Sequence, residues 1–287
     1  MAETKSNATN PGKNQAKKGN KKEEGSRKGG NIIAFLAVPI CLIIAFLFFY
    51  FVCGNPANFE GGITTGAAQP KNMLGTIYTG GIVIPFLMTL LLIVVTFVIE
   101  RFATIKKAKG KISNTKFLRS VQYNLANKEL DKALKECDKQ KGSLGNVMRS
   151  GLIMYKEMTT NTELTTEQKV INIQNEIDES TTLELPILEK NLVFLSTISS
   201  AATLLGLFGT VVGMIKAFQS LGETGGSSSS QLAVGIAEAL VNTATGILTS
   251  FIAIISYNYF TTNIDSITYG IDETGYTLTQ SFAANYE

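Results

Sequence analysis

Residues 232–257, LAVGIAEALVNTATGILTSFIAIISY, are apolar enough to cross a membrane, yet they include Glu238, Asn242 and several hydroxyl side chains. A helix that spans the roughly 30 Å hydrocarbon core needs about 20 mostly apolar residues. An ionisable side chain at that depth is costly, and by default it marks an ion pathway or a buried pair. The stretch therefore predicts a membrane helix with one polar side that faces a neighbour or water.

The rest of the chain has the same membrane character. Of its 287 residues, 45% are hydrophobic and 17% charged, against about 25% charged in soluble domains. We predict an all-α integral membrane protein with four transmembrane helices and long helices that extend into a cytoplasmic helical region. The expected segments are a disordered basic cytoplasmic tail (1–31), an extra N-terminal membrane anchor (32–53), a periplasmic loop (54–79), a transmembrane helix (80–100), a cytoplasmic helical domain (101–190), a transmembrane helix (191–221), a short periplasmic loop (222–230), a last transmembrane helix (231–263) and a cytoplasmic C-terminal tail (264–287).

Lysine and arginine counts set the expected orientation. Residues 1–31 hold eight of them, residues 54–79 hold only Lys71, and residues 100–190 hold sixteen. Basic residues concentrate on the cytoplasmic side of a membrane, so we expect both chain ends in the cytoplasm. The first apolar run is longer than the core of a signal peptide and is expected to be retained. The basic tail is interpreted as a topology signal that also touches anionic lipids, not as a nucleic-acid-binding arm.

The segment between the second and third spans shows helical periodicity. Phe117, Val121 and Leu125 recur every four residues, with a small phase slip after them, which indicates one helical face. A second helix that holds residues 147–154 is expected to fold back. The sequence TTEQ, residues 165–168, resembles a capping box. We predict that the helix it opens runs on to Ala217 as one rod of roughly 75 Å.

Catalytic chemistry has little support in this composition. The chain has no histidine and no tryptophan, and its three cysteines form no CxxC pair. Histidine-based triads and metal sites are thereby excluded, and no GxxxxGK[ST] phosphate loop is present. Each cysteine is expected to be a small buried apolar residue without a disulfide. We therefore expect no enzyme activity, no cofactor and no metal.

The last two spans carry polar stripes, whereas the first two are apolar all round. Residues that recur at intervals of three and four lie on one helical face. In the third span these are Ser199, Thr203, Gly206, Thr210 and Gly213, and in the fourth they are Glu238, Asn242, Thr245 and Thr249, with Thr243 and Gly246 on the adjoining face. Close helix packing explains the small residues, and Gly209 to Gly213 form a GxxxG pattern. A polar pathway is the alternative explanation.

Glu238 has no obvious partner within the chain, because Lys216 is the only other charge within the spans and lies near the outer edge. Glu238 lies seven residues from Gln231, roughly 10 Å, and Thr210 lies eight residues from Phe218, roughly 12 Å. In an antiparallel hairpin the two side chains are expected near one level. Several copies around an axis would then form a ring of polar groups.

Two stretches resemble a known family. LLGLFGTVVGMIKAF (204–218) followed by GIAEALVNTATG (235–246) is similar to the paired signature of the MotA/TolQ/ExbB proton channel family, closest to its ExbB branch. The stretches LELPILEKNLVFLSTISSAATLLG (183–206) and LDKALKECDKQKGSLGNVMRSGL (130–152) are also similar to that family. The resemblance covers about residues 80–263. Departures from the family pattern are the extra first span, Thr203 in place of proline, and Lys216.

The resemblance implies a bacterial inner-membrane motor with no enzymatic step. ExbB-like subunits form a pentameric ring around an ExbD-like single-span partner, whose membrane aspartate carries the proton. Proton motive force then does work on outer-membrane transport through a TonB-like protein. By motif alignment, Thr210 and Thr243 match the family's pore threonines, and Glu238 matches the glutamate of GIAEAL. Other candidates for the polar pathway are Asn242, Thr203, Ser199 and Thr245, and the candidates for helix packing are Gly206, Gly209, Gly213 and Gly246.

Other functions stay open at this point. A MotA-type stator and a TolQ-type envelope motor share the same signature. A passive membrane scaffold is a further alternative, although it would gain nothing from the cost of Glu238. A secondary transporter usually shows two related halves, and no internal repeat is visible in this sequence.

Overall fold

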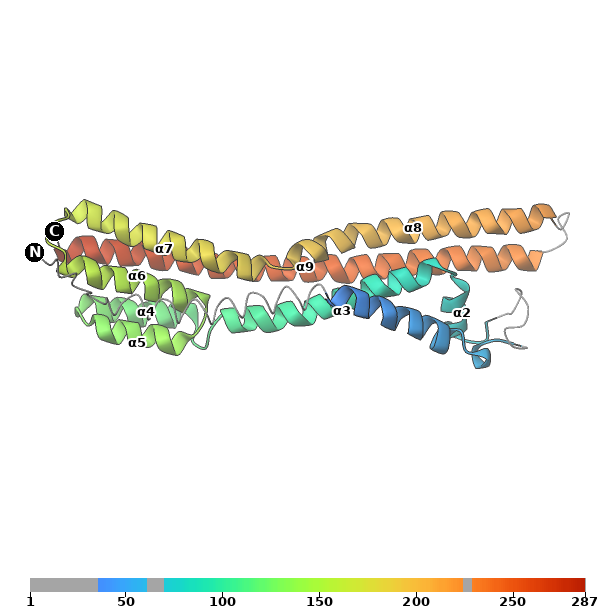
Figure 1. The fold of residues 1–287 in the computed structure, drawn as a ribbon, viewed down its shortest axis with the longest axis horizontal. Helices are drawn as coiled ribbons and strands as arrows, with labels where there is room; N and C mark the ends of the chain where they lie inside the picture. Colours follow the sequence, from blue (N-terminus) through green and yellow to red (C-terminus); the bar gives the residue numbers. More distant parts are fainter. Residues whose placement is uncertain (1–35, 61–69, 224–228, 287) are drawn as a thin grey trace, which may run out of the picture.

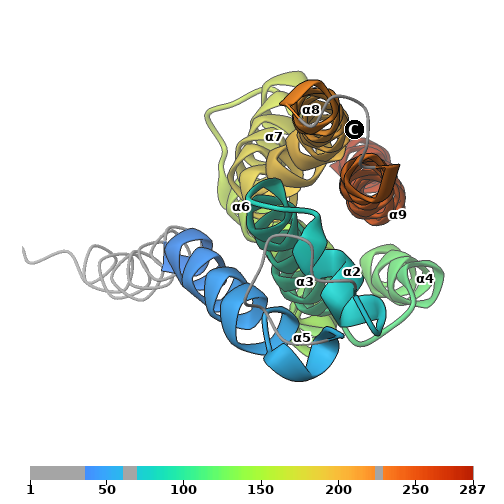
Figure 2. The same cartoon turned by 90° about the vertical axis from the view of Figure 1, so that its right-hand side faces the viewer.

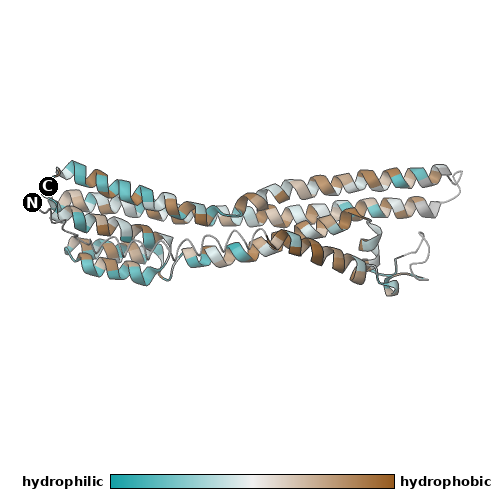
Figure 3. Cartoon of the chain, viewed as in Figure 1, coloured by the Kyte–Doolittle hydropathy of each residue, from teal (hydrophilic) through white to brown (hydrophobic). Residues whose placement is uncertain are grey.

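The computed structural model describes residues 36–60, 70–223 and 229–286, so the predicted tail 1–31 and parts of both predicted periplasmic loops lie outside it. The described chain is long and narrow, with helices laid along one direction (Figure 1). Four helices are long and apolar enough to cross a membrane, which confirms the predicted number of spans. Their apolar parts lie at one end, and more hydrophilic helices lie at the other (Figure 3).

The first two spans pack against each other. The first covers Leu36–Cys53 and ends in a π-helical turn, η1 (Phe48–Cys53), before the short 3₁₀ helix η2 (Pro56–Asn58). The connection then forms α2 (Met73–Thr79), and the second span is α3 (Val83–Ala108). The rings of Phe46 and Phe86 meet edge to face with centroids 5.5 Å apart. In the end-on view α3 lies between the first span and the α8–α9 pair (Figure 2).

The helical segment after α3 folds back on itself three times. Its first helices are α4 (Asn114–Ala126), α5 (Leu130–Gln140) and α6 (Ser143–Thr160). The one helix expected to continue through the phase slip is wrong, because Lys128 has a φ of 59° and separates α4 from α5. Phe117, Val121 and Leu125 are buried in one core with α6, as their spacing predicts.

The predicted rod from Thr166 to Ala217 is wrong. Its start is right, because Thr165 and Gln168 form a capping box before α7 (Thr166–Glu189). However, Asn191 has a φ of 65° and separates α7 from α8 (Leu192–Glu223). Asparagine tolerates this left-handed conformation better than most residues, and the ribbon changes direction there (Figure 1).

Arg101 holds this break in place from α3. Its side chain is 2% exposed and donates to the carbonyl oxygens of Ile187 at 3.2 Å and Leu188 at 3.1 Å. It also forms an ion pair with the Glu100 carboxylate, at 2.5 Å. The last carbonyls of a helix lack partners within the helix, and Arg101 supplies them for α7.

We expect Arg101→Met to destabilise the fold, because it removes a buried donor and leaves two α7 carbonyls without it. Hydrogen bonds to charged groups contribute roughly 1.5–3 kcal/mol, so the free energy of unfolding should fall by about that amount. Thermal unfolding of the purified protein in detergent measures the change. Arg119→Met, on the exposed side of α4, is the matched control, and an equal loss in both variants would contradict this role.

The last helix is longer than the predicted span. Helix α9 covers Ser229–Tyr286, so the residues assigned to a C-terminal tail continue the helix. Phe282 near its end is buried and meets the ring of Tyr155 on α6 at 4.8 Å. One helix therefore joins the apolar half of the molecule to the α4–α7 bundle.

Cys137 on α5 is buried, as are Cys41 and Cys53. Burial, with a smaller contribution from the Asp138 carboxylate, raises the pKa of the Cys137 thiol from 9.0 to about 12. The thiolate is the reactive form, and its fraction at pH 8 falls about a thousandfold for such a shift. We expect alkylation of Cys137 to stay slow up to pH 9 in the folded protein and to become fast after unfolding. Peptide mass spectrometry quantifies it, and fast labelling of the folded chain would contradict the burial.

Candidate functional site

The two polar spans, α8 and α9, approach each other through small residues. A Cβ atom built on Gly246 would lie 2.6 Å from the Ala202 carbonyl oxygen and 2.9 Å from the Gly206 Cα. A Cβ on Gly213 would lie 3.1 Å from the backbone nitrogen of Ala239. Such close backbone approach is what small residues permit between membrane helices.

We expect Gly246→Ala to separate α8 from α9, because the new methyl group would meet backbone atoms that cannot rotate away. Overpacking of a tight contact costs roughly 1–3 kcal/mol. The midpoint of thermal unfolding in detergent should fall accordingly. Gly222→Ala is the matched control, since nothing in the described part of the chain lies within 4 Å of a Cβ built there. Equal stability of the two variants would contradict the close packing.

We call the close contact between α8 and α9 the seam. One edge of the seam carries a pair of hydroxyl groups. The Oγ1 atoms of Thr210 on α8 and Thr243 on α9 are in direct hydrogen-bonding contact. The Thr210 hydroxyl also lies 3.2 Å from the Gly206 carbonyl oxygen and 3.3 Å from that of Ala239. Both threonines are half-buried. Hydroxyl groups can donate and accept, so this pair can rearrange its protons without any movement of the backbone.

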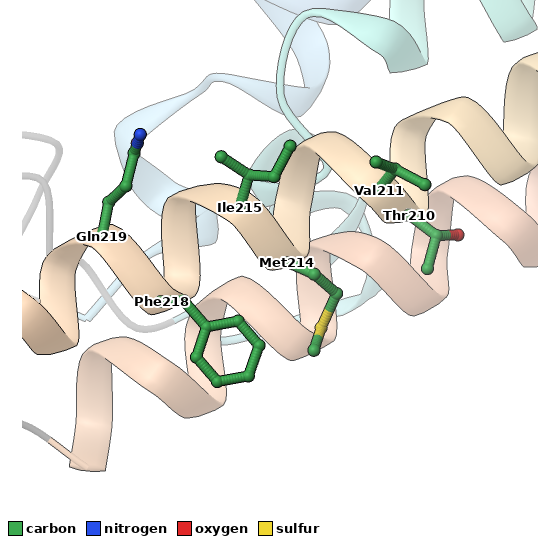
Figure 4. Close-up of a pocket in the computed structure, with 6 residues that line it drawn as sticks. All are labelled: Thr210, Val211, Met214, Ile215, Phe218 and Gln219. Atoms are coloured by element: carbon green, nitrogen blue, oxygen red, sulfur yellow. The ribbon is translucent and has the colours of Figure 1, made fainter.

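Beside this pair lies an open apolar groove of about 600 Å³ along α8. Thr210, Met214 and Phe218 lie on the side of α8 toward α9, whereas Ile215 and Gln219 point the other way (Figure 4). Thr210 therefore lies in the wall of an apolar groove that opens to the outside of the described chain.

The other edge of the seam holds the charged groups. The Glu238 carboxylate, 13% exposed, pairs with the Lys216 ammonium at 3.1 Å. Five residues separate Glu238 from Thr243, which turns them about 140° apart around α9. The structure therefore corrects one expectation, because Glu238 has a partner within the chain. It also shows that Glu238 projects from a different side of α9 than Thr243, the partner of Thr210.

Glu238 and Asn242 dock on the turn between α2 and α3. Gly81 in this turn has a φ of 72°, and a Cβ there would lie 2.4 Å from Glu238 Oε1. Asn242 is buried and donates from Nδ2 to the Gly80 carbonyl oxygen at 3.0 Å. The Asn242 Oδ1 atom has no hydrogen-bond partner in the described part of the chain. Sequence reasoning missed both glycines, although the GG pair that opens the second apolar run is a turn signal.

The remaining candidates are not gathered with either group. The hydroxyls of Ser199, Thr203 and Thr245 donate to carbonyl oxygens of their own helices, at 2.7, 3.4 and 2.8 Å. Such bonds satisfy a hydroxyl locally. Within the described ranges, no group of three or more histidine, cysteine, aspartate or glutamate side chains could hold a metal ion.

Comparison with known proteins places the two polar spans in a family. Residues 142–273 match the model of the MotA/TolQ/ExbB proton channel family. This part of the chain belongs to that family. The matched residues include all of α8, the hydroxyl pair of Thr210 and Thr243, and the Lys216–Glu238 ion pair.

Relatives of this segment carry two different names. The Tol-Pal system protein TolQ of Haemophilus influenzae is 37% identical over 84 residues, 29% of this chain and 37% of the relative. TolQ of Pseudomonas aeruginosa is 42% identical over 73 residues, 25% of this chain and 32% of the relative. The biopolymer transport protein ExbB of Neisseria meningitidis serogroup A is 26% identical over 200 residues, 67% of this chain and 88% of the relative. The chain thus spans about a third of the TolQ relatives and most of the ExbB relative.

Proposed function

We propose that this protein is an ExbB-like subunit of a proton-driven motor in the bacterial inner membrane and has no enzymatic step. Five copies would form a ring around an ExbD-like single-span partner with a membrane aspartate, with both ends of each chain in the cytoplasm. The ring would use the proton motive force to energise TonB-dependent outer-membrane transport. The hydroxyl pair of Thr210 and Thr243 beside an open groove is the observation that carries this proposal.

The chemistry of the pair suits a proton-carrying carboxylate. A carboxylate in the bilayer is costly unless neighbouring groups donate to it. Two hydroxyls at one site can donate to the charged carboxylate and accept from the protonated one. Both forms would then have partners at the same position, which is what repeated loading and unloading of a proton requires.

The rest of the site would support this pair. The α8–α9 glycines keep the two threonines in register, because they set the distance between the helices. The Lys216–Glu238 pair, on the opposite edge, would hold the α2–α3 turn and shape the electrostatics of that side. Glu238 would therefore position the α2–α3 turn. The hydroxyls of Thr210 and Thr243 would contact the partner.

A TolQ-type envelope motor is the second candidate, because the TolQ relatives are 37% and 42% identical over the matched segments, while the ExbB relative is 26% identical over a longer one. A MotA-type stator shares the family signature. A non-conducting scaffold is the remaining alternative, and the mutual contact of two hydroxyls next to an open groove does not favour it.

Gentle purification from the native membrane, followed by native mass spectrometry, tests the proposal. We expect a small single-span protein with one membrane aspartate at about two copies for every five of this chain. A TonB-like protein in the same preparation would support the ExbB type. A Tol-Pal component would shift the assignment to the TolQ type. This chain alone, under conditions that preserve other membrane complexes, would contradict the motor.

A further inference from the structure

A second site lies where the apolar helices meet the α4–α7 bundle. A cavity of about 330 Å³ opens between the end of α3, the start of α6 and the end of α7. Residues 83–99 of α3 are uncharged and span roughly 26 Å, close to the thickness of the hydrocarbon core. The cavity begins at Glu100, so it lies at the level of lipid headgroups.

The cavity is basic. Lys107 on α3, Lys141 in the α5–α6 turn and Lys190 after α7 all line it. Within the described residues, none of these three lysines belongs to an ion pair. Lys107 and Lys141 are exposed and Lys190 is half-buried, so the three lysines place positive charge from three separate elements around one opening.

The acidic groups of the same cavity are already engaged. Glu100 accepts two hydrogen bonds from Arg101, at 2.5 and 2.7 Å. Glu184 accepts from the Asn146 side chain at 2.9 Å. With four basic and two acidic side chains in the lining, the cavity keeps an excess of positive charge that its own carboxylates do not neutralise.

Helix α6, 18 residues long, begins inside this cavity. Its N-cap, Gly142, provides no side-chain cap, and the first N–H groups of a helix attract anions. Ser143, the first residue of α6, lines the cavity and is only 5% exposed. Among the hydrogen bonds of the described chain there is none from the Ser143 hydroxyl. The Ser143 hydroxyl, which opens into the cavity from a residue that is otherwise buried, and the uncapped start of α6 can therefore both donate to a ligand with acceptor oxygens.

We propose that this cavity binds a phosphate group, from the headgroup of an anionic lipid or from free phosphate. The Ser143 hydroxyl and the first N–H groups of α6 would donate to the phosphate oxygens, and Lys107, Lys141 and Lys190 would balance the charge. Because the phosphate would join α3, α6 and the α7–α8 connection, it would brace the break between α7 and α8 that Arg101, also in the lining, holds. This site is separate from the Thr210–Thr243 pair and does not depend on the proposed motor.

Native mass spectrometry of the purified full-length complex, titrated with phosphatidylglycerol and separately with inorganic phosphate, tests the proposal. Each lysine near an anionic headgroup contributes about fivefold in affinity, so Lys107→Gln and Lys141→Gln should each weaken binding about fivefold. Ser143→Ala should weaken it about fivefold as well, because one hydrogen bond is lost. Lys106→Gln, an exposed neighbour on α3 outside the cavity, is the matched control and should bind as the unaltered protein does.

The two ligands distinguish the source. Phosphatidylglycerol that binds at concentrations at which inorganic phosphate does not supports a lipid headgroup in the cavity, and inorganic phosphate that binds at least as tightly as the lipid supports a free ion. Two outcomes overturn the proposal: binding of neither ligand, or equal weakening by Lys106→Gln and Lys107→Gln. Circular dichroism of each variant verifies that a loss of binding does not come from a loss of helix.

Discussion

Thr210→Val and Thr243→Val are expected to abolish proton-driven work while the complex still assembles. Each variant keeps the volume of the side chain and removes one hydroxyl of the contacting pair. A hydrogen bond to a charged group contributes roughly 1.5–3 kcal/mol, and 1.4 kcal/mol is about tenfold in an equilibrium constant. Proton flux should therefore fall about tenfold or more. A pH-sensitive dye inside vesicles that hold the purified chain with the proposed single-span partner measures the flux under an imposed potential.

The control for this experiment is Thr197→Val. Thr197 is an exposed threonine of the same helix whose hydroxyl donates to the Val193 carbonyl oxygen at 2.8 Å. The Thr197→Val variant should conduct protons as the unaltered protein does. Thr210→Ser keeps a hydroxyl and should recover most of the flux, which a merely structural role for the methyl group would not allow. If Thr210→Val conducts as well as Thr197→Val, the two hydroxyls are not contacts of the proton carrier.

Local signals in the sequence predicted most of the helices. The four apolar runs were sufficient to place the spans, and the capping box at Thr165 was sufficient to start α7. The spacing of Phe117, Val121 and Leu125 identified the buried face of α4. These features depend on residues within one or two helical turns, so a single sequence contains them in full.

Long-range contacts explain what the sequence did not predict. The break at Asn191 is held by Arg101, 90 positions earlier in the chain, and the tolerance of asparagine for a positive φ is only a weak local signal for it. The extension of α9 to Tyr286 depends on packing against Tyr155. Counting residues from the external link gives the depth of Thr210 and Glu238 but not the side of the helix from which each side chain projects. The rotation of α9 against α8, fixed by glycines such as Gly246, puts them on opposite edges.

Lys216→Gln is expected to be more harmful than Glu238→Gln, although both break the same ion pair. Glu238 is 13% exposed and lies against the α2–α3 turn, so without Lys216 it becomes an unpaired charge with little access to water. Lys216 is 51% exposed, and a long lysine side chain can move its ammonium group to water. Breaking a buried pair costs about 3–5 kcal/mol. We expect roughly 1–3 kcal/mol for Lys216→Gln, because the exposure of Lys216 screens the pair.

The double variant Lys216→Gln/Glu238→Gln should regain most of the stability that Lys216→Gln loses, because the stranded charge is then gone. Thermal unfolding and proton flux of all four proteins form a double-mutant cycle that isolates the coupling. If the pair positions the α2–α3 turn, flux should follow stability across the cycle. If instead Glu238→Gln abolishes flux at unchanged stability while Lys216→Gln conducts normally, Glu238 carries protons itself. The proposal that Glu238 only positions the α2–α3 turn would then be wrong.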